Sequence, residues 1–216
     1  EAGITILSPD NQTARIRFSS PSTNTDVGGA TIFYRQNINR MKVGTAVAGG
    51  TTQLVSGADV AAVSCDGNGA VTMPLQPAFW VRPASTQSNL AANNSAVTVV
   101  WGTETYDINA DFASNTFTAP VTGKYFMHVR LSLQSIDTSA SYYSISIVTS
   151  NNSHAWIYDP RGMDQDTNLF VVNLTAVADM DASDTAIVTI TQPNGTAQTD
   201  IIHTSSYSSW YGYLLG

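Results

Sequence analysis

Charged residues are scarce in this chain, and the two charged types that favour helices are nearly absent. Only 12% of the 216 residues are charged, against about 25% in an ordinary soluble domain. The chain has two glutamates, Glu1 and Glu104, and two lysines, Lys42 and Lys124, but fourteen aspartates. Glu and Lys form helices readily, whereas Asp favours turns. The composition therefore predicts strands joined by polar turns, and no segment has a convincing helical pattern.

Clustered basic charge, paired cysteines and long hydrophobic runs are also missing. The net charge is −7 and the seven arginines are scattered along the sequence, so we expect no nucleic-acid partner. The single cysteine, Cys65, cannot form an internal disulfide, and no second thiol or histidine lies near it for a metal site. No apolar run approaches the roughly 20 residues that span a bilayer, so we expect no membrane insertion. The opening residues have no signal-peptide pattern. We therefore expect that the N-terminus has been trimmed or that the chain is a piece of a longer protein.

The clearest strand pattern lies in the stretch from Phe117 to Leu133. Between residues 125 and 133 every second residue is apolar, which indicates a long strand with one buried face. The last residues, Ser205 to Gly216, form a second, aromatic strand pattern. So much apolar surface at the chain end must be buried, so we expect this end to belong to the core.

Ten strands punctuated by turns are predicted in the C-terminal two thirds of the chain, with no helical spacers between them. This pattern is typical of an antiparallel sandwich of jelly-roll type. The predicted strands are 78–82, 96–101, 104–107, 115–118, 124–133, 142–149, 154–158, 168–175, 185–191 and 208–215.

The sequence divides into three segments. Residues 1–45 are a β-rich segment of short strands at 4–6, 14–18, 30–34 and 41–43, separated by polar turn clusters. Such short strands bury little area, so they would be marginal unless other chains cover them. Residues 46–76 form a connector rich in Gly, Ala and Thr with one or two short strands, and residues 77–216 form the jelly-roll domain.

Motifs in the third segment resemble the domain of complement C1q and the tumour necrosis factor family. The order and spacing agree over about 140 residues, with departures at Met127, where the family often has Phe, and at Ser183, where it usually has Gly. The matching residues are Phe79, Trp101, Tyr106-Asp107, Phe117-Thr118-Ala119-Pro120, Gly123-Lys124-Tyr125 and Trp210-Tyr211-Gly212-Tyr213-Leu214-Leu215.

The resemblance implies a ten-strand jelly roll that assembles into a compact homotrimer. The N- and C-terminal strands of such a trimer lie near its threefold axis. The residues that we predict for the trimer core are Trp210, Tyr211, Tyr213, Leu215 and Tyr125.

The first segment resembles the β-rich modules of bacteriophage tail fibres and other virion appendages. The resemblance rests on the stretch ARIRFSSPSTNTDVGGATIFYRQNINRMKVGT, residues 14–45. It implies an intertwined, trimeric shaft, which would explain why this segment has too little core for a monomer. The predicted fold class is therefore all-β: a C1q/TNF-like jelly-roll knob preceded by a short trimerisation segment.

Catalytic patterns are weak. The three histidines, His128, His154 and His203, stand far apart, and no Gly-x-Ser-x-Gly elbow presents a nucleophile. A paired-carboxylate glycosidase would use the aspartates in 159–166 or those in 179–184, but depolymerases usually need a long β-solenoid that this chain has no room for. We therefore predict that the protein is not an enzyme and needs no cofactor.

Two further kinds of site are considered for polar and aromatic residues. The aspartates Asp164, Asp166, Asp181 and Asp184 are weak candidates for Ca²⁺ ligands, and the simpler interpretation is that they cap turns. The loop 151–166 combines aromatics with Arg, as sugar-binding sites and binding hot spots do, although alternation equally allows Trp156 and Tyr158 to be core. The residues predicted to bind a receptor are His154, Trp156, Tyr158, Arg161, Met163, Tyr142 and Tyr143.

Together these patterns predict a non-enzymatic structural and adhesion protein of a virion, either a tail fibre or a head fibre. Its expected partners are two further copies of itself, other virion proteins at the N-terminus, and a glycan or protein of the host surface. Two alternatives stay open: a secreted C1q/TNF-like ligand, and a capsid-decorating protein without a receptor.

Overall fold

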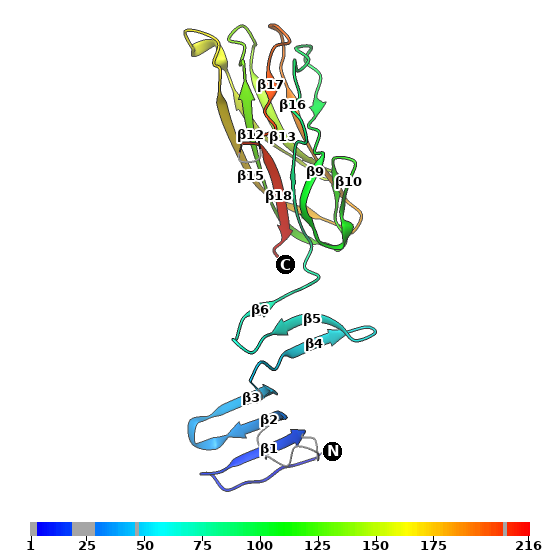
Figure 1. Ribbon diagram of the computed structural model, residues 1–216, viewed down its shortest axis with the longest axis vertical. Coiled ribbons are helices and arrows are strands. Elements are labelled where there is room, and N and C mark those ends of the chain that lie inside the picture. The colour runs from blue at the N-terminus through cyan, green and yellow to red at the C-terminus, as the bar shows by residue number, and fades with distance from the viewer. Residues whose placement is uncertain (1–3, 19–28, 46–47, 205–206) are drawn as a thin grey trace. The chain divides into compact units, whose positions relative to one another are not determined.

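The computed structural model describes residues 4–18, 29–45, 48–204 and 207–216, and it divides into two compact units, Glu1–Leu75 and Gln76–Gly216 (Figure 1). Among the described residues the only helical pieces are three single turns of 3-10 helix, namely η2 (Gln36–Ile38), η3 (Ile108–Ala110) and η4 (Pro160–Gly162). The all-β prediction is confirmed. No helix in the described ranges is long and apolar enough to cross a membrane.

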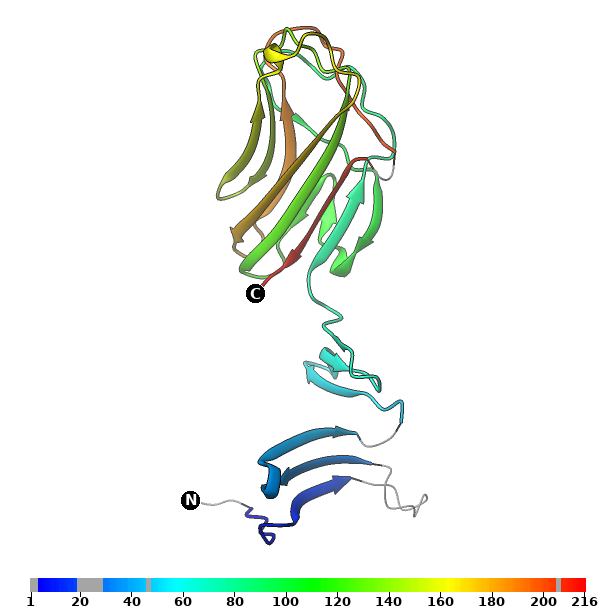
Figure 2. The same ribbon diagram turned by 90° about the vertical axis from the view of Figure 1, so that its left-hand side faces the viewer.

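Two antiparallel sheets form the C-terminal unit, as Figures 1 and 2 show from two sides. The first sheet has the order β15 (Phe170–Met180), β12 (Gly123–Gln134), β18 (Ser209–Leu214), β7 (Ala78–Arg82), β9 (Thr103–Asp107), with β17 (Asp200–Ile201) beside β12. The second has the order β10 (Phe112–Ala113), β11 (Thr116–Thr118), β16 (Thr185–Thr191), β13 (Tyr143–Thr149), β14 (Ser153–Tyr158), with β8 (Val97–Thr98) beside β16.

The chain crosses repeatedly between the two sheets. It changes sheet from β11 to β12, from β12 to β13, from β14 to β15 and from β15 to β16. Repeated crossing between two antiparallel sheets is the topology of a jelly roll, so the predicted jelly-roll sandwich is confirmed. Two strands, β10 and β17, were not predicted, because strands of two residues are too short to show an alternation.

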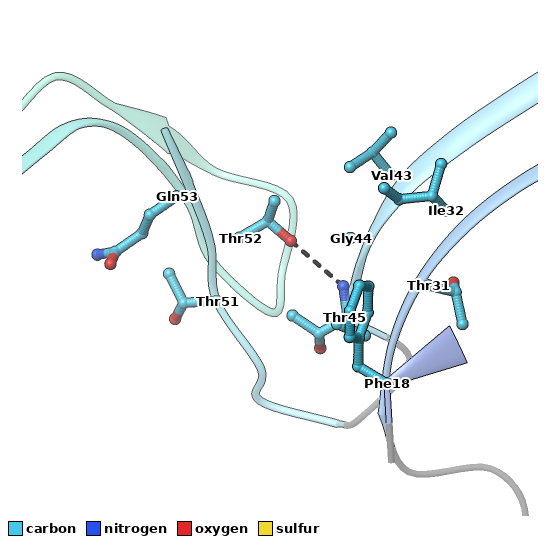
Figure 3. A pocket seen from close by; sticks show the side chains of 10 residues that line it. Phe18, Thr31, Ile32, Val43, Gly44, Thr45, Thr51, Thr52 and Gln53 are labelled. Carbon is cyan, nitrogen blue, oxygen red and sulfur yellow. Dashed lines mark hydrogen bonds between the residues drawn. The ribbon is translucent and has the colours of Figure 1, made fainter. Parts of the chain in front are cut away.

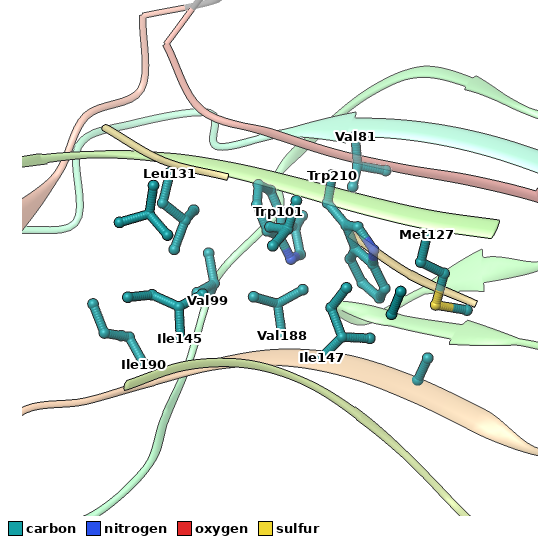
Figure 4. Close-up of a cluster of buried hydrophobic side chains, with 14 of the residues drawn as sticks. Val81, Val99, Trp101, Met127, Leu131, Ile145, Ile147, Val188, Ile190 and Trp210 are labelled. Carbon is teal, nitrogen blue, oxygen red and sulfur yellow. The ribbon is translucent and has the colours of Figure 1, made fainter. Parts of the chain in front are cut away.

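The core lies between the two sheets and follows from the alternation in each strand. On β12 the side chains of Tyr125, Met127 and Leu131 have no exposed surface, and Ile145 and Ile147 of β13 are equally buried. Figure 4 shows Met127 and Leu131 on the opposite side of the cluster from Ile145 and Ile147. Each large apolar side chain buried in this way contributes about 1.5–3 kcal/mol to folding.

Aromatic rings fill one part of this core. Phe79 stacks on Phe117 with 4.7 Å between the ring centres. Trp210 meets Phe79 edge-on, with 4.9 Å between centres. Because Phe79 and Trp210 come from neighbouring strands and Phe117 comes from the facing sheet, these contacts hold the two sheets together.

The C-terminal strand is the middle strand of its sheet. β18 pairs with β12 on one side and with β7 on the other. Beyond the ladder, the Leu215 amide donates to the Lys124 carbonyl at 2.7 Å, and the Leu214 amide donates to that of Pro77 at 3.0 Å. The expectation that the aromatic chain end belongs to the core is therefore confirmed in part: the strand lies inside the sheet and Trp210 is buried, whereas Tyr213 and Leu215 are exposed.

Two small antiparallel sheets form the N-terminal unit. One consists of β1 (Thr13–Phe18), β2 (Ala30–Arg35) and β3 (Arg40–Thr45), and the other of β4 (Thr52–Ser56), β5 (Val60–Cys65) and β6 (Val71–Thr72). The strand predicted at residues 4–6 is not formed, and the connector holds three strands instead of one or two. None of the residues described between 4 and 75 is buried.

Candidate functional site

One face of the first C-terminal sheet points away from the core and carries a row of rings. The strand register fixes the row: His128 of β12 pairs with Tyr211 of β18, Tyr211 pairs with Trp80 of β7, and Trp80 pairs with Tyr106 of β9. Two of these pairs are in ring contact, with 5.0 Å between the centres of His128 and Tyr211 and 6.1 Å between those of Trp80 and Tyr106. Cross-strand aromatic pairs of this kind stabilise the sheet that carries them.

A second row of apolar side chains lies beside the first. Phe126 of β12 pairs with Val177 of β15 and with Tyr213 of β18. The rings of Phe126 and Tyr213 are stacked, with 5.1 Å between their centres, yet Tyr213 is 42% exposed and Val177 is 52% exposed. The six rings of these two rows are called the aromatic face: Trp80, Tyr106, Phe126, His128, Tyr211 and Tyr213.

One polar group of the aromatic face is the imidazole of His128. His128 Nδ1 lies 2.8 Å from Thr175 Oγ1 of the neighbouring strand. Burial lowers the pKa of His128, the positive charge of Arg130 lowers it further, and a hydrogen bond with Asn173 opposes both effects. The imidazole therefore stays neutral to a lower pH than an ordinary histidine does, as is usual for a partly buried histidine.

The residues predicted for the trimer core divide between the inside and the outside of one chain. Tyr211 and Tyr213 belong to the aromatic face, and Leu215 is half exposed beside it. Trp210 and Tyr125 have no exposed surface in a single chain, so a second copy cannot reach them. This corrects the prediction for these two residues: alternation along β18 and β12 turns them into the core of the sandwich.

Phe126, His128, Trp80 and Tyr106 were not among the predicted site residues. The sequence pattern that could have identified two of them is the alternation in β12. Phe126 and His128 occupy the positions between its buried residues, so they lie on the outward face of the strand. These two aromatic positions lie between Lys124 and Arg130 on the outward face of the strand, where a sheet with one face in water usually has polar residues. Trp80 and Tyr106 could not be placed beside them from the sequence, because that requires the order and register of the strands.

An uncovered apolar face also occurs in the N-terminal unit. Ile16, Ile32 and Val43 pair across β1, β2 and β3, and all three side chains are exposed. Figure 3 shows Phe18, Ile32 and Val43 at a hollow of about 260 Å³ that this sheet forms with residues 51–53. Across it, the Thr45 amide donates to Thr52 Oγ1 at 3.3 Å.

The first part of the predicted receptor-binding loop is a strand, β14. His154, Trp156 and Tyr158 lie on β14 and face the core side of the sheet, because Trp156 pairs with the buried Ile145. All three are half-buried, and Trp156 packs against the core. The alternation thus places Trp156 and Tyr158 at the edge of the sandwich, partly as core.

Phe170 of β15 completes an aromatic cluster at that edge. The rings of Trp156 and Tyr158 are stacked with 5.7 Å between their centres, and Tyr158 stacks on Phe170 at 5.0 Å. Phe170 belongs to the other sheet. The cluster therefore closes the side of the sandwich where β14 and β15 meet.

The remaining members of the predicted receptor set lie in different surroundings. Arg161 is exposed and forms an ion pair with Asp159 at 2.6 Å. Met163 Sδ accepts a hydrogen bond from Thr167 Oγ1 at 2.9 Å, and Tyr142 is half-buried. Tyr143 has no exposed surface, so the prediction that it contacts a receptor is corrected.

The hydroxyl group of Tyr143 is part of a buried hydrogen-bond network instead. It accepts from the Asp137 amide at 3.0 Å and lies 2.7 Å from Thr199 Oγ1. Thr199 Oγ1 donates to the Ser135 carbonyl at 3.1 Å, so the Tyr143 hydroxyl is the donor to Thr199. Burial raises the pKa of Tyr143.

The aspartates considered as calcium ligands are turn residues in this structure. Asp166 accepts from the Thr138 amide and hydroxyl, both at 2.9 Å. Asp184 accepts from the Asp181 amide at 2.8 Å and from Asn151 Nδ2 at 2.6 Å. Within the described ranges no three or more His, Cys, Asp or Glu side chains come together as a metal site would require.

These features define the C-terminal unit as a jelly-roll domain with one exposed aromatic face. Among solved structures it is similar to the globular domain of zebrafish complement 1qA, with 19% identity and a TM-score of 0.46 over 65% of this chain and 98% of that chain. Murine APRIL is similar at 10% identity and a TM-score of 0.47, over 65% of this chain and 99% of its own. No protein-family model and no curated protein sequence matches the chain.

Proposed function

We propose that this protein is a non-enzymatic adhesion protein that works as a homotrimer, with the aromatic face of each copy covered by the other two. The observation that carries the proposal is the aromatic face itself: six rings on one side of a single sheet, with Tyr106 and Tyr213 each more than 40% exposed. Contiguous apolar surface of this kind marks an interaction site. A second copy is the partner that the chain always has at hand.

The N-terminal unit supports the same assembly. None of its described residues is buried in one chain, and its first sheet exposes Phe18, Ile32 and Met41. Strands with no core of their own need cover from other chains. Two further copies of residues 1–75, packed through these apolar side chains, would provide that cover in a trimeric shaft.

The non-enzymatic role is supported by what the aspartates do. Asp159 pairs with Arg161, and Asp166 and Asp184 accept hydrogen bonds from neighbouring amides. Carboxylates that are engaged in turns are poorly placed for acid–base work on a substrate. Adhesion needs no such chemistry, and three copies of each exposed loop give avidity to weak single sites.

The setting that we propose is a virion, as a tail fibre or head fibre that contacts the host surface. It rests on the fibre-like pattern of residues 14–45, and it makes the N-terminal unit the segment that joins other virion proteins. In a virion the C-terminal unit is the knob that is presented to the host.

The oligomeric part of the proposal is tested by the mass in solution of the full chain and of two variants. Phe126→Glu puts a charge into the aromatic face, whereas Ile157→Glu puts the same charge at an apolar residue that is 66% exposed on the other sheet. We expect trimers for the wild type and for Ile157→Glu, and monomers for Phe126→Glu. A trimer in all three proteins would contradict the proposed interface.

A further inference from the structure

Basic residues gather on one side of the first N-terminal sheet. The register places Arg15 of β1 beside Phe33 of β2, and Phe33 beside Lys42 of β3. Arg35 pairs with Arg40 across β2 and β3, and Arg17 shares the side of Arg15 because it is two residues further along β1. The side chains that form this cationic face are Arg15, Arg17, Phe33, Arg35, Arg40 and Lys42.

This concentration of charge is unlike the rest of the chain. Five of the nine basic residues lie on the cationic face, whereas the whole chain has a net charge of −7. All five are exposed. Among the residues that the structure describes, no ion pair joins Arg15, Arg35, Arg40 or Lys42 to a carboxylate. Arg35 and Arg40 are direct cross-strand partners, and like charges at such positions repel one another, so an anionic ligand would reduce that repulsion.

A hollow lies at the β3 edge of the sheet and opens beside the cationic face. It has a volume of about 470 Å³ and is lined by Thr31, Phe33, Lys42 and Gly44 of the cationic side and by Met41, Val43 and Thr45 of the apolar side. Gly44 pairs with Thr31, and Thr52 Oγ1 lies 3.0 Å from the place that a Cβ atom on Gly44 would take. The hollow thus combines a flat apolar wall with a cation at its side.

The two sides of this sheet have opposite chemistry. Ile16, Ile32 and Val43 lie on the apolar side, and alternation along each strand sends Arg15, Phe33 and Lys42 to the other side. Copies that cover the apolar side leave the cationic side facing outward. The cationic face is therefore available for a ligand in the proposed trimer as well as in a single chain.

From this arrangement we infer that the cationic face binds an acidic polysaccharide, a polymer of sugar rings that carry carboxylate groups. A sugar ring fits the hollow and packs its apolar side on Phe33, while Lys42 and Arg15 reach carboxylates on either side. Arginine pairs with carboxylates through two parallel hydrogen bonds. The inference rests on the proposed adhesion function and deepens it. It adds a ligand contact on the N-terminal unit to the contact that the knob makes with the host, and it names the class of that ligand.

Two other polyanions fit the face less well. Single-stranded nucleic acid binds through several aromatic platforms in succession, and this face has one ring, Phe33. A peptide of acidic residues alone has charge but no ring to fill the hollow beside Phe33. The polysaccharide matches both the spread of charge and the single aromatic wall.

The test uses the full chain and a galacturonic acid decasaccharide, with binding followed by titration calorimetry at several salt concentrations. We expect Lys42→Gln to weaken binding several-fold and Arg15→Gln with Lys42→Gln to weaken it about tenfold or more, with a shallower dependence on salt. Phe33→Val should also weaken binding, but it should leave the salt dependence unchanged because it removes no charge. Lys124→Gln is the matched control, since it removes an exposed lysine of the other unit, and it should bind as the wild type does.

Three ligands of other chemistry complete the experiment: a neutral maltodecaose, oligothymidylate with ten phosphates, and polyglutamate of ten residues. The inference is overturned if Lys42→Gln binds the decasaccharide as tightly as Lys124→Gln does. It is overturned equally if oligothymidylate or polyglutamate binds more tightly than the decasaccharide. The mass of each variant in solution is measured alongside, so that failure of the trimer is separated from failure of the glycan site.

Discussion

The imidazole ring of His128 lies against the phenol ring of Tyr211, with 5.0 Å between the two ring centres. The two residues are cross-strand partners on β12 and β18, so the pairing of these two interior strands fixes the contact. It places a titratable group among the rings of the aromatic face. The account of this face therefore leads to a prediction about pH.

We expect the fold to lose stability as the pH falls through the titration of His128. Its pKa is lowered in the folded state, first by burial and then by Arg130, so the unfolded chain binds the proton more tightly. The stabilisation is complete above the unfolded pKa of about 6.5 and is lost as the pH drops towards the folded pKa. Melting temperatures measured between about pH 7.5 and pH 5.5 should fall less steeply in His128→Gln than in the wild type. Equal slopes in the two proteins would contradict the role of His128.

Tyr143 and Tyr142 are neighbours with opposite roles, and this makes them a matched pair. Tyr143→Phe removes the hydroxyl that bonds to Asp137 and Thr199 inside the fold, so it should lower the free energy of unfolding by about 1–3 kcal/mol. Tyr142→Phe alters a half-exposed ring and should change it by less than about 0.5 kcal/mol. Urea unfolding of residues 76–216 measures both, and equal effects would argue against the buried network.

Gly212 is a position where the fold leaves no room for a side chain. A Cβ atom there would lie 2.9 Å from the Phe126 carbonyl oxygen and 2.9 Å from Phe79 Cε1. Gly212→Ala should therefore destabilise the C-terminal unit by about 1–3 kcal/mol through overpacking. Gly162→Ala is the control, because nothing lies within 4 Å of the added atom. A thermal melt that shifts equally for both variants would show that Gly212 is not tightly packed.

Asp159 and Arg161 form a local ion pair that can be detected through the pKa of Asp159. Hydrogen bonds from the Arg161 side chain and amide lower the pKa of Asp159 to about 2. In Arg161→Gln the hydrogen bond from the backbone amide of residue 161 stays but the guanidinium is lost, so the pKa of Asp159 should rise towards its ordinary value. Carboxyl carbon shifts followed by NMR measure this directly. Because both groups are exposed, Arg161→Gln should not alter the melting temperature noticeably.

Alternation in the sequence was enough to predict the fold of the C-terminal unit. The apolar residues from Tyr125 to Leu133 identify β12, and the aromatic run around Trp210 identifies a buried terminal strand. The same alternation failed at short strands such as β10, where two residues show no period. It also overreached at residues 4–6, where apolar residues occur without a partner strand.

Sites that depend on register could not be predicted from the sequence. His128, Tyr211 and Trp80 are far apart along the chain and become neighbours only through the order β12, β18, β7. The arginines look scattered for the same reason, and pairing of β1, β2 and β3 gathers four of the seven on one face. Composition suggested where rings and charges are abundant, but only the pairing of strands shows which of them meet.

The central claim is that the aromatic face joins three copies of the chain. The most direct test is the solution mass by light scattering of the full chain and of residues 76–216, which contain the buried core of the C-terminal unit. The account predicts three times 23.0 kDa for the full chain and a trimer for the shorter fragment as well, since the aromatic face lies within it. A monomer in both cases would contradict the account and leave the aromatic face to another partner.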